Sequence, residues 1–156
     1  MKKSTAFIFL LICLLPFSCK WYSDINVAQW PFGVKYEIFV MSFADGDGNG
    51  KGDFKGLTQK LDYLQDLGVT AIWLAPFQPS PMRDHGYDVC DYYGIDPRLG
   101  TLGDFVEFTR CARNKGMRVM MDLVVNHTSI DHPWFQAARS AADSPYRDYY
   151  VWSPEK

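Results

Sequence analysis

The feature that most constrains this chain is an alternation of apolar runs with amphipathic segments. Residues 34–43 are rich in β-branched and aromatic side chains, which favours a strand, while residues 69–75 and 117–125 are short, largely apolar runs. Such runs are typical of strands buried on both faces of a parallel sheet. Between them, apolar residues recur every three or four positions, which indicates helices. The order strand, helix, strand, helix, strand predicts an α/β fold with right-handed parallel crossovers.

The two predicted helices have clear apolar faces and ends. In the first, over residues 54–67, the apolar face comprises Phe54, Leu57, Leu61, Leu64 and Leu67, and a glycine follows as a stop signal. The second begins at Thr101 with Asp104 three residues later, which is a capping-box pattern. Its inner face comprises Phe105, Phe108 and Ala112.

The pattern alone is compatible with a (β/α)₈ barrel and with an open doubly wound sheet. No glycine-rich dinucleotide fingerprint follows the first predicted strand, which counts against a Rossmann domain. The composition, with 47% hydrophobic and 22% charged residues, is that of a globular domain.

The first 18 residues resemble an export signal. Two lysines precede an apolar run over residues 6–17, which is too short for a stable bilayer-spanning helix. Ser18-Cys19 resembles the lipobox of bacterial lipoproteins, in which Cys19 would become a lipidated first residue and anchor the protein to a membrane. Ordinary signal cleavage is the alternative. We therefore expect export to the periplasm or cell envelope, with residues 19–32 as a lead-in segment.

The net charge limits which partners are expected, and the number of cysteines limits the possible disulfides. The formal net charge of −2 and the lack of a basic cluster argue against nucleic acid as a partner. Cys90 and Cys111 remain in the predicted folded part, where they could form a disulfide in an oxidising compartment or serve as small buried side chains.

The loop after the first predicted strand has the pattern of a calcium site. Asp45, Asp47, Asn49 and Asp53 alternate with glycines, and the carbonyl of Lys51 lies between the last two. Hard oxygen ligands on a tight turn suit Ca²⁺. The loop lacks the final glutamate of an EF-hand, and a flexible acidic turn is the alternative.

Two further segments gather polar residues after predicted strands. Asp84, His85 and Tyr87 lie in the loop after the second strand, where a carboxylate could accept sugar hydroxyls and a phenol ring could stack on a sugar. A solvated loop is the alternative. Near the end of the third strand, Asp122 precedes Asn126 and His127. Polar groups there favour a functional site over a core histidine, since the carboxyl ends of parallel strands carry the sites in barrel enzymes.

Several segments together resemble the α-amylase family of glycoside hydrolases. In chain order they are YEIFVMSF, DGDGNGKGDFKGL, LGVTAIWLAP, RDHGYDVCDY, GTLGDF and DLVVNHTS. Within the family the chain is most similar to trehalose synthases and oligo-1,6-glucosidases, which share DHPWF and YRDYYVW. The resemblance covers residues 30–153.

The resemblance implies a (β/α)₈ TIM barrel. Residues 33–128 would form the N-terminal part of that catalytic barrel, with its first three βα units, and residues 129–156 would begin the inserted B domain. The implied ligand is an α-glucoside or malto-oligosaccharide. The resemblance also implies Ca²⁺ binding in the loop that matches Asp45 to Asp53.

The resemblance assigns roles to the site residues. Asp84 would hold sugar hydroxyls and pair with a downstream arginine, and Tyr87 would stack on the ring, with His85 at a variable position between them. Asn126 and His127 would contribute to the glucose subsite. Asp122 would mainly orient its neighbours.

The family's retaining mechanism needs two carboxyl groups about 5 Å apart. The resemblance places both downstream of residue 156, so no residue of this chain is expected to be catalytic and the chain alone is expected to be inactive. The implied activity of the parent enzyme is hydrolysis or transfer at α-glucosidic bonds of maltose, trehalose or oligosaccharides. A non-catalytic amylase-like binding or assembly protein, or a decayed gene product, is the alternative.

Overall fold

A three-stranded parallel sheet forms the centre of the computed structural model, which describes residues 33–154. Its strands are β1 (Val34–Ile38), β2 (Val69–Leu74) and β3 (Arg118–Met121), in the order β1-β2-β3. The parallel pairing confirms the predicted α/β fold. The predicted signal peptide, the lead-in segment and Cys19 lie outside the described residues.

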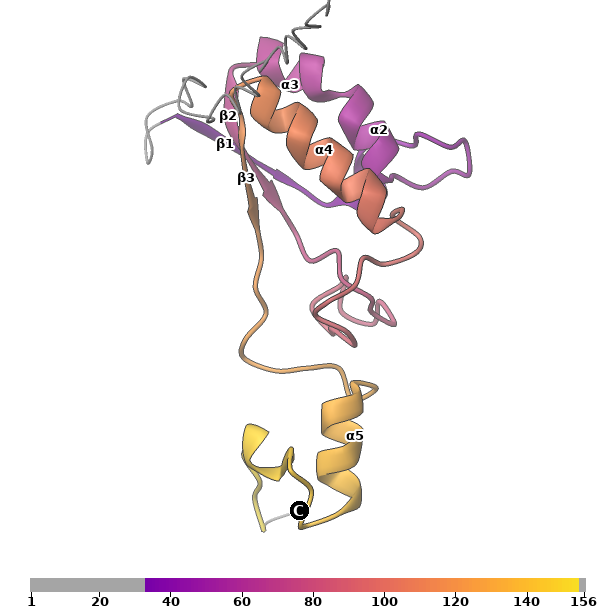
Figure 1. Cartoon of the computed structure of the whole chain (residues 1–156), viewed down its shortest axis with the longest axis vertical. Helices are drawn as coiled ribbons and strands as arrows, with labels where there is room; N and C mark the ends of the chain where they lie inside the picture. The colour runs from indigo at the N-terminus through magenta and orange to yellow at the C-terminus, as the bar shows by residue number, and fades with distance from the viewer. Residues whose placement is uncertain (1–32, 155–156) are drawn as a thin grey trace, which may run out of the picture.

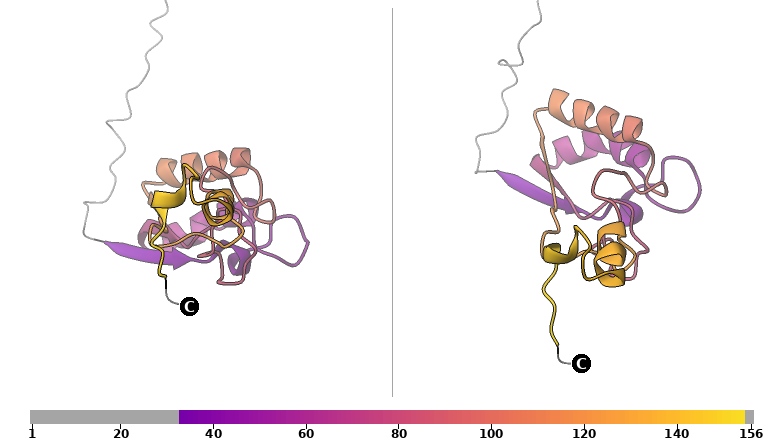
Figure 2. Two further views of the ribbon diagram at one scale, coloured as in Figure 1. Left: turned by 90° about the horizontal axis from the view of Figure 1, so that it is seen from below. Right: turned by 60° about the horizontal axis from the view of Figure 1, so that its bottom comes forward.

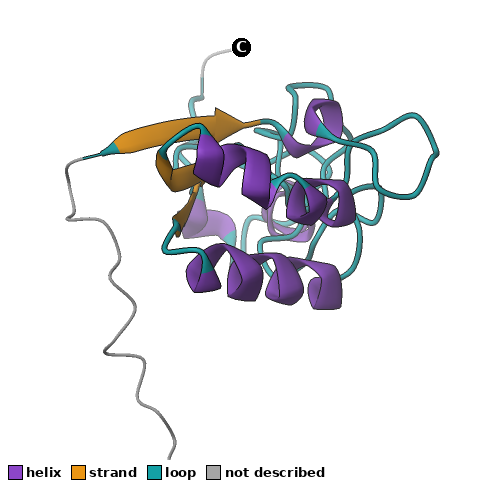
Figure 3. Ribbon diagram, turned by 90° about the horizontal axis from the view of Figure 1, so that it is seen from above, coloured by secondary structure: helices purple, strands orange, loops and turns teal. Residues whose placement is uncertain are grey.

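Helices α2 (Phe54–Gln59), α3 (Leu61–Asp66) and α4 (Leu102–Asn114) pack on one face of the sheet (Figures 1 and 3). The strands contribute Ile38, Ile72 and Leu74 to the core beneath them. Because side chains alternate across a sheet, Glu37 and Trp73, which are paired in register, lie on the opposite face. That face holds the polar site described below.

The core under the helices is organised around the fully buried Phe54. Its ring lies 5.5 Å from Phe77, 5.3 Å from Phe105 and 5.8 Å from Phe108, measured between centroids. Aromatic pairs at such separations stabilise a core beyond the area they bury. The residue before it, Asp53, caps α2 by accepting a hydrogen bond from the backbone N–H of Gly56 at 2.7 Å.

The first strand is shorter than predicted. β1 ends at Ile38, and Val40–Phe43 form a one-turn helix, α1, so the predicted strand over residues 34–43 is wrong in its second half. Val40 is nonetheless buried. The apolar, β-branched composition there reflects burial in the core rather than an extended backbone, which is the usual weakness of β-propensity.

The helix predicted over residues 54–67 is interrupted. Lys60 leaves the helical region at ψ 3° and separates α2 from α3, although Leu57, Leu61 and Leu64 all remain fully buried. Leu67 is exposed, contrary to the prediction, because it lies just beyond the last turn of α3. The apolar period therefore identified the packed face but not the break.

The third strand is also shorter and less buried than predicted. It ends at Met121 instead of residue 125, and its four residues are exposed or half-buried. It pairs with β2 alone among the described residues, so one of its edges has no described neighbour. Beyond Met121 the backbone keeps one contact with the sheet, in which the Asp122 N–H donates to the Leu74 carbonyl at 3.0 Å.

The predicted start of the second helix is confirmed. Thr101 and Asp104 form both hydrogen bonds of the capping box at the beginning of α4. Phe108 and Ala112 are fully buried, and Phe105 is half-buried. Cys90 and Cys111 are free thiols, each half-buried. None of the helices within residues 33–154 combines the length and apolar character needed to cross a membrane.

Residues after β3 form a small helical unit that the sequence pattern did not predict. Helix α5 (Pro133–Ser140) and the 3-10 helix η2 (Arg147–Tyr149) contact each other and lie beyond the carboxyl end of β3 (Figures 1 and 2). His132 caps α5, since its Nδ1 accepts a hydrogen bond from the Trp134 N–H at 3.1 Å. Burial lowers the pKa of His132, which favours the neutral ring that this cap requires.

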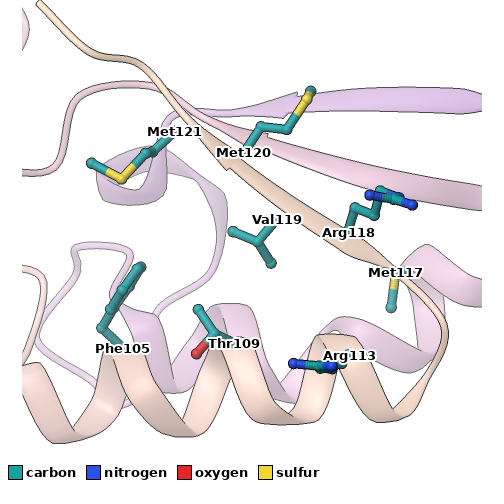
Figure 4. A pocket seen from close by; sticks show the side chains of 8 residues that line it. All are labelled: Phe105, Thr109, Arg113, Met117, Arg118, Val119, Met120 and Met121. Atoms are coloured by element: carbon teal, nitrogen blue, oxygen red, sulfur yellow. The ribbon is translucent and has the colours of Figure 1, made fainter. Parts of the chain in front are cut away.

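Between α4 and β3 the structure leaves a cavity of about 680 Å³ (Figure 4). Phe105 and Thr109 face it from the helix, and Val119 and Met121 face it from the strand. Among the described residues no second strand pairs with this edge of β3, and the cavity beside it leaves the packing of α4 on the strand incomplete.

We therefore predict that residues 19–156, expressed alone, do not fold cooperatively. Thermal unfolding followed by near-ultraviolet circular dichroism should give a broad or absent transition, because the β3 edge and the adjoining cavity leave the core unfinished. A sharp two-state transition would show that this part of the protein is a self-sufficient domain.

Candidate functional site

Apart from the predicted calcium loop, the polar site residues predicted from the sequence lie in two segments that leave the sheet at the carboxyl ends of β2 and β3. Residues 75–101 follow β2, and residues 122–132 follow β3. Parallel strands β2 and β3 are paired in register up to Leu74 and Met121, so both segments begin side by side.

The segment after β2 is folded around the carboxylate of Asp88. Its Oδ1 accepts a hydrogen bond from the Ser80 hydroxyl at 2.5 Å, and its Oδ2 accepts one from the Arg83 N–H at 3.0 Å. The Asp84 N–H also approaches Oδ1, at 3.3 Å. A tight turn results, in which Met82 and His85 have positive φ angles of 60° and 51°. Asp88 thereby presents Asp84 outward, on an ordered loop.

Two side chains from different elements donate hydrogen bonds to the carboxylate of Asp122. The Tyr87 hydroxyl donates to Oδ2 at 2.7 Å, and the indole N–H of Trp73 donates to Oδ1 at 2.8 Å. Tyr87 comes from the loop after β2, Trp73 from β2 itself, and Asp122 follows β3 directly. We call these three residues the Asp122 cluster.

The Asp122 cluster strongly favours the protonated form of Tyr87. The hydrogen bond to Asp122 raises the pKa of Tyr87 to about 12, with further contributions from burial and from the negative charges of Asp122, Glu37 and Asp84. The Tyr87 ring is therefore neutral over the whole physiological pH range. Its hydroxyl is committed to Asp122.

Asp84 and His85 flank this cluster without joining it. Asp84 is exposed, and among the described residues its carboxylate oxygens accept no hydrogen bond. The His85 ring instead makes an edge contact with Phe39, with 6.4 Å between centroids. The Asp84 carboxylate oxygens are therefore available to accept hydrogen bonds, and the neighbouring Tyr87 ring is held in place through its hydroxyl.

Besides the Asp122 cluster, several contacts tie the segment after β3 to the loop after β2, and Tyr92 makes two of them, with the carbonyls of Val124 and His127. The Tyr92 hydroxyl donates to the Val124 carbonyl at 2.6 Å. The Ser129 N–H donates to the Val89 carbonyl at 2.9 Å. An ion pair at 2.8 Å also joins Arg83 to Asp131, from the loop after β2 to the segment after β3.

Asn126 and His127 lie on this tied segment, in a different environment from Tyr87. The Asn126 amide nitrogen and His127 Nδ1 are 3.1 Å apart, within hydrogen-bonding distance. Both residues line a cavity of about 370 Å³ whose other walls are largely aromatic. Aromatic residues of that wall are Tyr92, Tyr93, Trp134, Tyr149 and Tyr150.

The structure thus brings together some predicted site residues and leaves others apart. Tyr87 and Asp122 are in direct contact, and Asp84 acts electrostatically on Tyr87. Asn126 and His127 contact each other, but no hydrogen bond joins them to the Asp122 cluster among the described residues.

Sequence reasoning assigned no role of their own to Trp73, Asp88 and Tyr92. Trp73 was included only in an apolar run, although it is 38% exposed. Its partner is 49 residues away, so no local spacing could reveal the hydrogen bond. A tryptophan on a strand whose other residues are mostly buried is the one signal that could have drawn attention to it.

The predicted calcium loop has a geometry that fits a divalent cation. Carboxylate oxygens of Asp45, Asp47 and Asp53 all lie within 4.8 Å of one another. Two oxygens bound to one Ca²⁺ are at most about 5 Å apart, since each Ca–O distance is about 2.3–2.6 Å. The Asn49 side-chain amide donates to Asp47 at 2.9 Å. The loop projects beside α2 (Figure 1).

Hydrogen bonds hold the Asp45 carboxylate in its ionised form. The backbone N–H of Gly50 is the main cause of its lowered pKa, and Gly48 contributes as well. These two N–H groups approach its oxygens at 2.7 Å each. An ionised carboxylate is the form that a cation requires.

Comparison with known proteins identifies the family. The profile of the α-amylase catalytic domain matches residues 37–156, which is most of the chain. The chain is 48% identical over 155 residues to alpha-amylase 3 of Dictyoglomus thermophilum, and 58% identical over 120 residues to a trehalose synthase of Pimelobacter sp.. This chain therefore belongs to the α-amylase family.

Solved structures give the same result. The chain superimposes on the α-amylase from H. orenii with a TM-score of 0.75 at 51% identity, over 80% of this chain and 27% of that one. A MutB mutant solved with glucose gives a TM-score of 0.74 at 48% identity, over 77% and 22%. These neighbours are TIM-barrel enzymes, which supports the barrel assignment.

The chain spans only part of its relatives. The match covers 99% of this chain but 30% of the Dictyoglomus protein, and 77% of this chain but 21% of the Pimelobacter protein.

We predict that Asp122→Asn lowers the pKa of Tyr87 from about 12 towards the ordinary value of about 10. The substitution removes the negative charge and leaves a single acceptor oxygen, for which the Trp73 indole N–H and the Tyr87 hydroxyl would compete. The measurement is ¹⁹F NMR titration of the complete gene product with 3-fluorotyrosine at position 87, a label that titrates at lower pH than tyrosine. The same label at the exposed Tyr93 should be unaffected. An unchanged titration at position 87 would contradict the prediction.

Proposed function

We propose that the complete gene product is a retaining α-glucosidase or transglucosidase, and that this chain supplies part of its glucose-binding subsite. The observation that carries the proposal is the arrangement of Asp84 beside Tyr87, in a chain of the α-amylase family. Relatives are named trehalose synthase, trehalose-6-phosphate hydrolase and glucan 1,6-alpha-glucosidase. We infer substrates of the same class, such as maltose, trehalose or related oligosaccharides.

Asp84 and Tyr87 would offer a glucose ring two complementary contacts. Carboxylate oxygens of Asp84 would accept hydrogen bonds from sugar hydroxyls, which are among the stronger hydrogen bonds because the acceptor is charged. The Tyr87 ring, held through its hydroxyl by Asp122 at 2.7 Å, would stack on the apolar face of the sugar. Asn126 and His127 would add donors on the neighbouring segment.

Neither Asp84 nor Asp122 is proposed as a catalytic carboxyl group. Both Asp122 oxygens already accept hydrogen bonds, at 2.8 Å and 2.7 Å, which leaves Asp122 a structural role. A retaining mechanism needs a nucleophile and an acid/base about 5 Å apart. We propose that this pair lies in the part of the gene product that follows residue 156.

We also propose that the loop containing Asp45, Asp47 and Asp53 holds a structural Ca²⁺. The support is the convergence of three carboxylates within 4.8 Å. The carbonyl of Lys51 and the side chain of Asn49 would supply further oxygen ligands. The ion would fix the conformation of the loop beside α2 and take no part in the chemistry.

Two proposals rest on the sequence alone. Residues 129–156 are proposed to begin an inserted B domain. Residues 1–18 are proposed as an export signal, with lipidation of Cys19 anchoring the protein to the cell envelope.

We predict that Asp84→Ala lowers kcat/KM for 4-nitrophenyl α-glucoside about 100-fold, and His127→Ala about tenfold, in the complete gene product. Two lost charge-assisted hydrogen bonds at about 1.5 kcal/mol each correspond to the larger factor. Azide should not rescue Asp84→Ala, because rescue is the behaviour of a missing catalytic carboxylate.

Asp66→Ala, an exposed substitution at the end of α3, is the matched control. Wild-type levels of activity in Asp84→Ala would contradict its place in the subsite. Inactivity of the wild-type protein on every α-glucoside would instead indicate a non-catalytic member of the family.

We predict that a chelator lowers the melting temperature of the wild-type protein by roughly 5 °C, because loss of a native-state ligand removes its binding free energy. Asp47→Ala should abolish this chelator effect, since it removes a ligand and leaves the Asp53 helix cap intact. Asp143→Ala, an exposed aspartate outside the loop, should retain it. Equal chelator shifts in all three proteins would show that the loop is only a turn.

A further inference from the structure

Trp73 occupies an unusual position for a tryptophan on a strand. Its neighbours Ile72 and Leu74 are fully buried under the helices, whereas Trp73 lies on the opposite face of the sheet and is 38% exposed. Its ring belongs to no described aromatic pair and is outside the buried core cluster. Packing on the helices therefore does not explain why an indole stands here.

The hydrogen bond to Asp122 does give this indole a function. Trp73 donates to Oδ1 of Asp122, and Tyr87 donates to Oδ2, so both oxygens of one carboxylate are held from two sides. The Asp122 backbone is fixed as well, by its N–H bond to the Leu74 carbonyl. With its main chain and both oxygens held, the carboxylate has one orientation. That orientation determines where the Tyr87 hydroxyl, and hence its ring, lies.

We propose that Trp73 is a positioning residue for the glucose-binding subsite, acting through Asp122 on Tyr87. Its indole N–H fixes the Asp122 carboxylate, and the carboxylate fixes the ring on which the sugar would stack. The inference rests on the proposed function, because that function assigns the Tyr87 ring to glucose. It adds a residue that acts on the Tyr87 ring through Asp122.

The test variant is Trp73→Phe in the complete gene product, since phenylalanine keeps an aromatic ring and removes the N–H donor; the loss of ring volume that comes with it is matched in the control variant below. We expect kcat/KM for an α-glucoside to fall about tenfold, the effect of one lost hydrogen bond to a charged group. In a Tyr87→Phe background the same substitution should cost less than about twofold, because the link that it acts through is already broken. Additive losses in the double variant would overturn the proposal.

A second readout does not depend on activity. The ¹⁹F resonance of 3-fluorotyrosine at position 87 should shift or broaden in Trp73→Phe, because the ring loses its single orientation. Trp152→Phe is the matched control. Trp152 is 37% exposed, and its indole N–H donates to the Arg147 carbonyl at 2.9 Å, outside the Asp122 cluster. This control should change neither the resonance nor kcat/KM.

The two readouts separate failure of this inference from failure of the proposed function. If the wild-type protein turns over no α-glucoside but the ¹⁹F resonance responds to Trp73→Phe, the proposed function fails and the positioning of Tyr87 by Trp73 stands. If the protein is active but the resonance is identical in wild type and Trp73→Phe, the positioning role is wrong.

Discussion

The parallel register of β2 with its two neighbours is the constraint on which the rest of this structure depends. Leu74 pairs with Ile38 on one side and with Met121 on the other, so the carboxyl ends of the three strands lie at the same end of the sheet. The chain segments that follow β2 and β3 therefore start side by side. That proximity lets Tyr87 and Asp122, 35 residues apart in sequence, form a hydrogen bond of 2.7 Å.

The sequence predicted what depends on local periodicity and missed what depends on distant partners. Apolar spacing located the packed faces of the helices, and the capping box located the start of α4. The end of β1 and the break at Lys60 were missed, because burial gives the same residue pattern in a strand, a turn or a helix. Asp122 was found from its place near the end of a predicted strand, whereas the role of Trp73 depends on a hydrogen bond to a residue 49 positions away.

The two aspartates whose charges act on Tyr87 have different roles. Each oxygen of Asp122 accepts a hydrogen bond from a protein donor, so this carboxylate is held in place by Trp73 and Tyr87. Asp84, which acts on the same tyrosine through its charge, is exposed and uncommitted. A sequence that contains both carboxylates cannot reveal this difference, because it arises from which donors the fold brings within reach.

Asp53 connects the acidic loop to the hydrophobic core. Asp53 contributes to the carboxylate group of the loop, and its Oδ1 also caps α2 through the Gly56 N–H. The next residue, Phe54, is the centre of the aromatic core. A cation held by the loop would restrict the Asp53 side chain and thereby the first turn of α2. Its binding free energy would then stabilise the packing of Phe54, because a ligand that binds only the native state shifts folding towards that state.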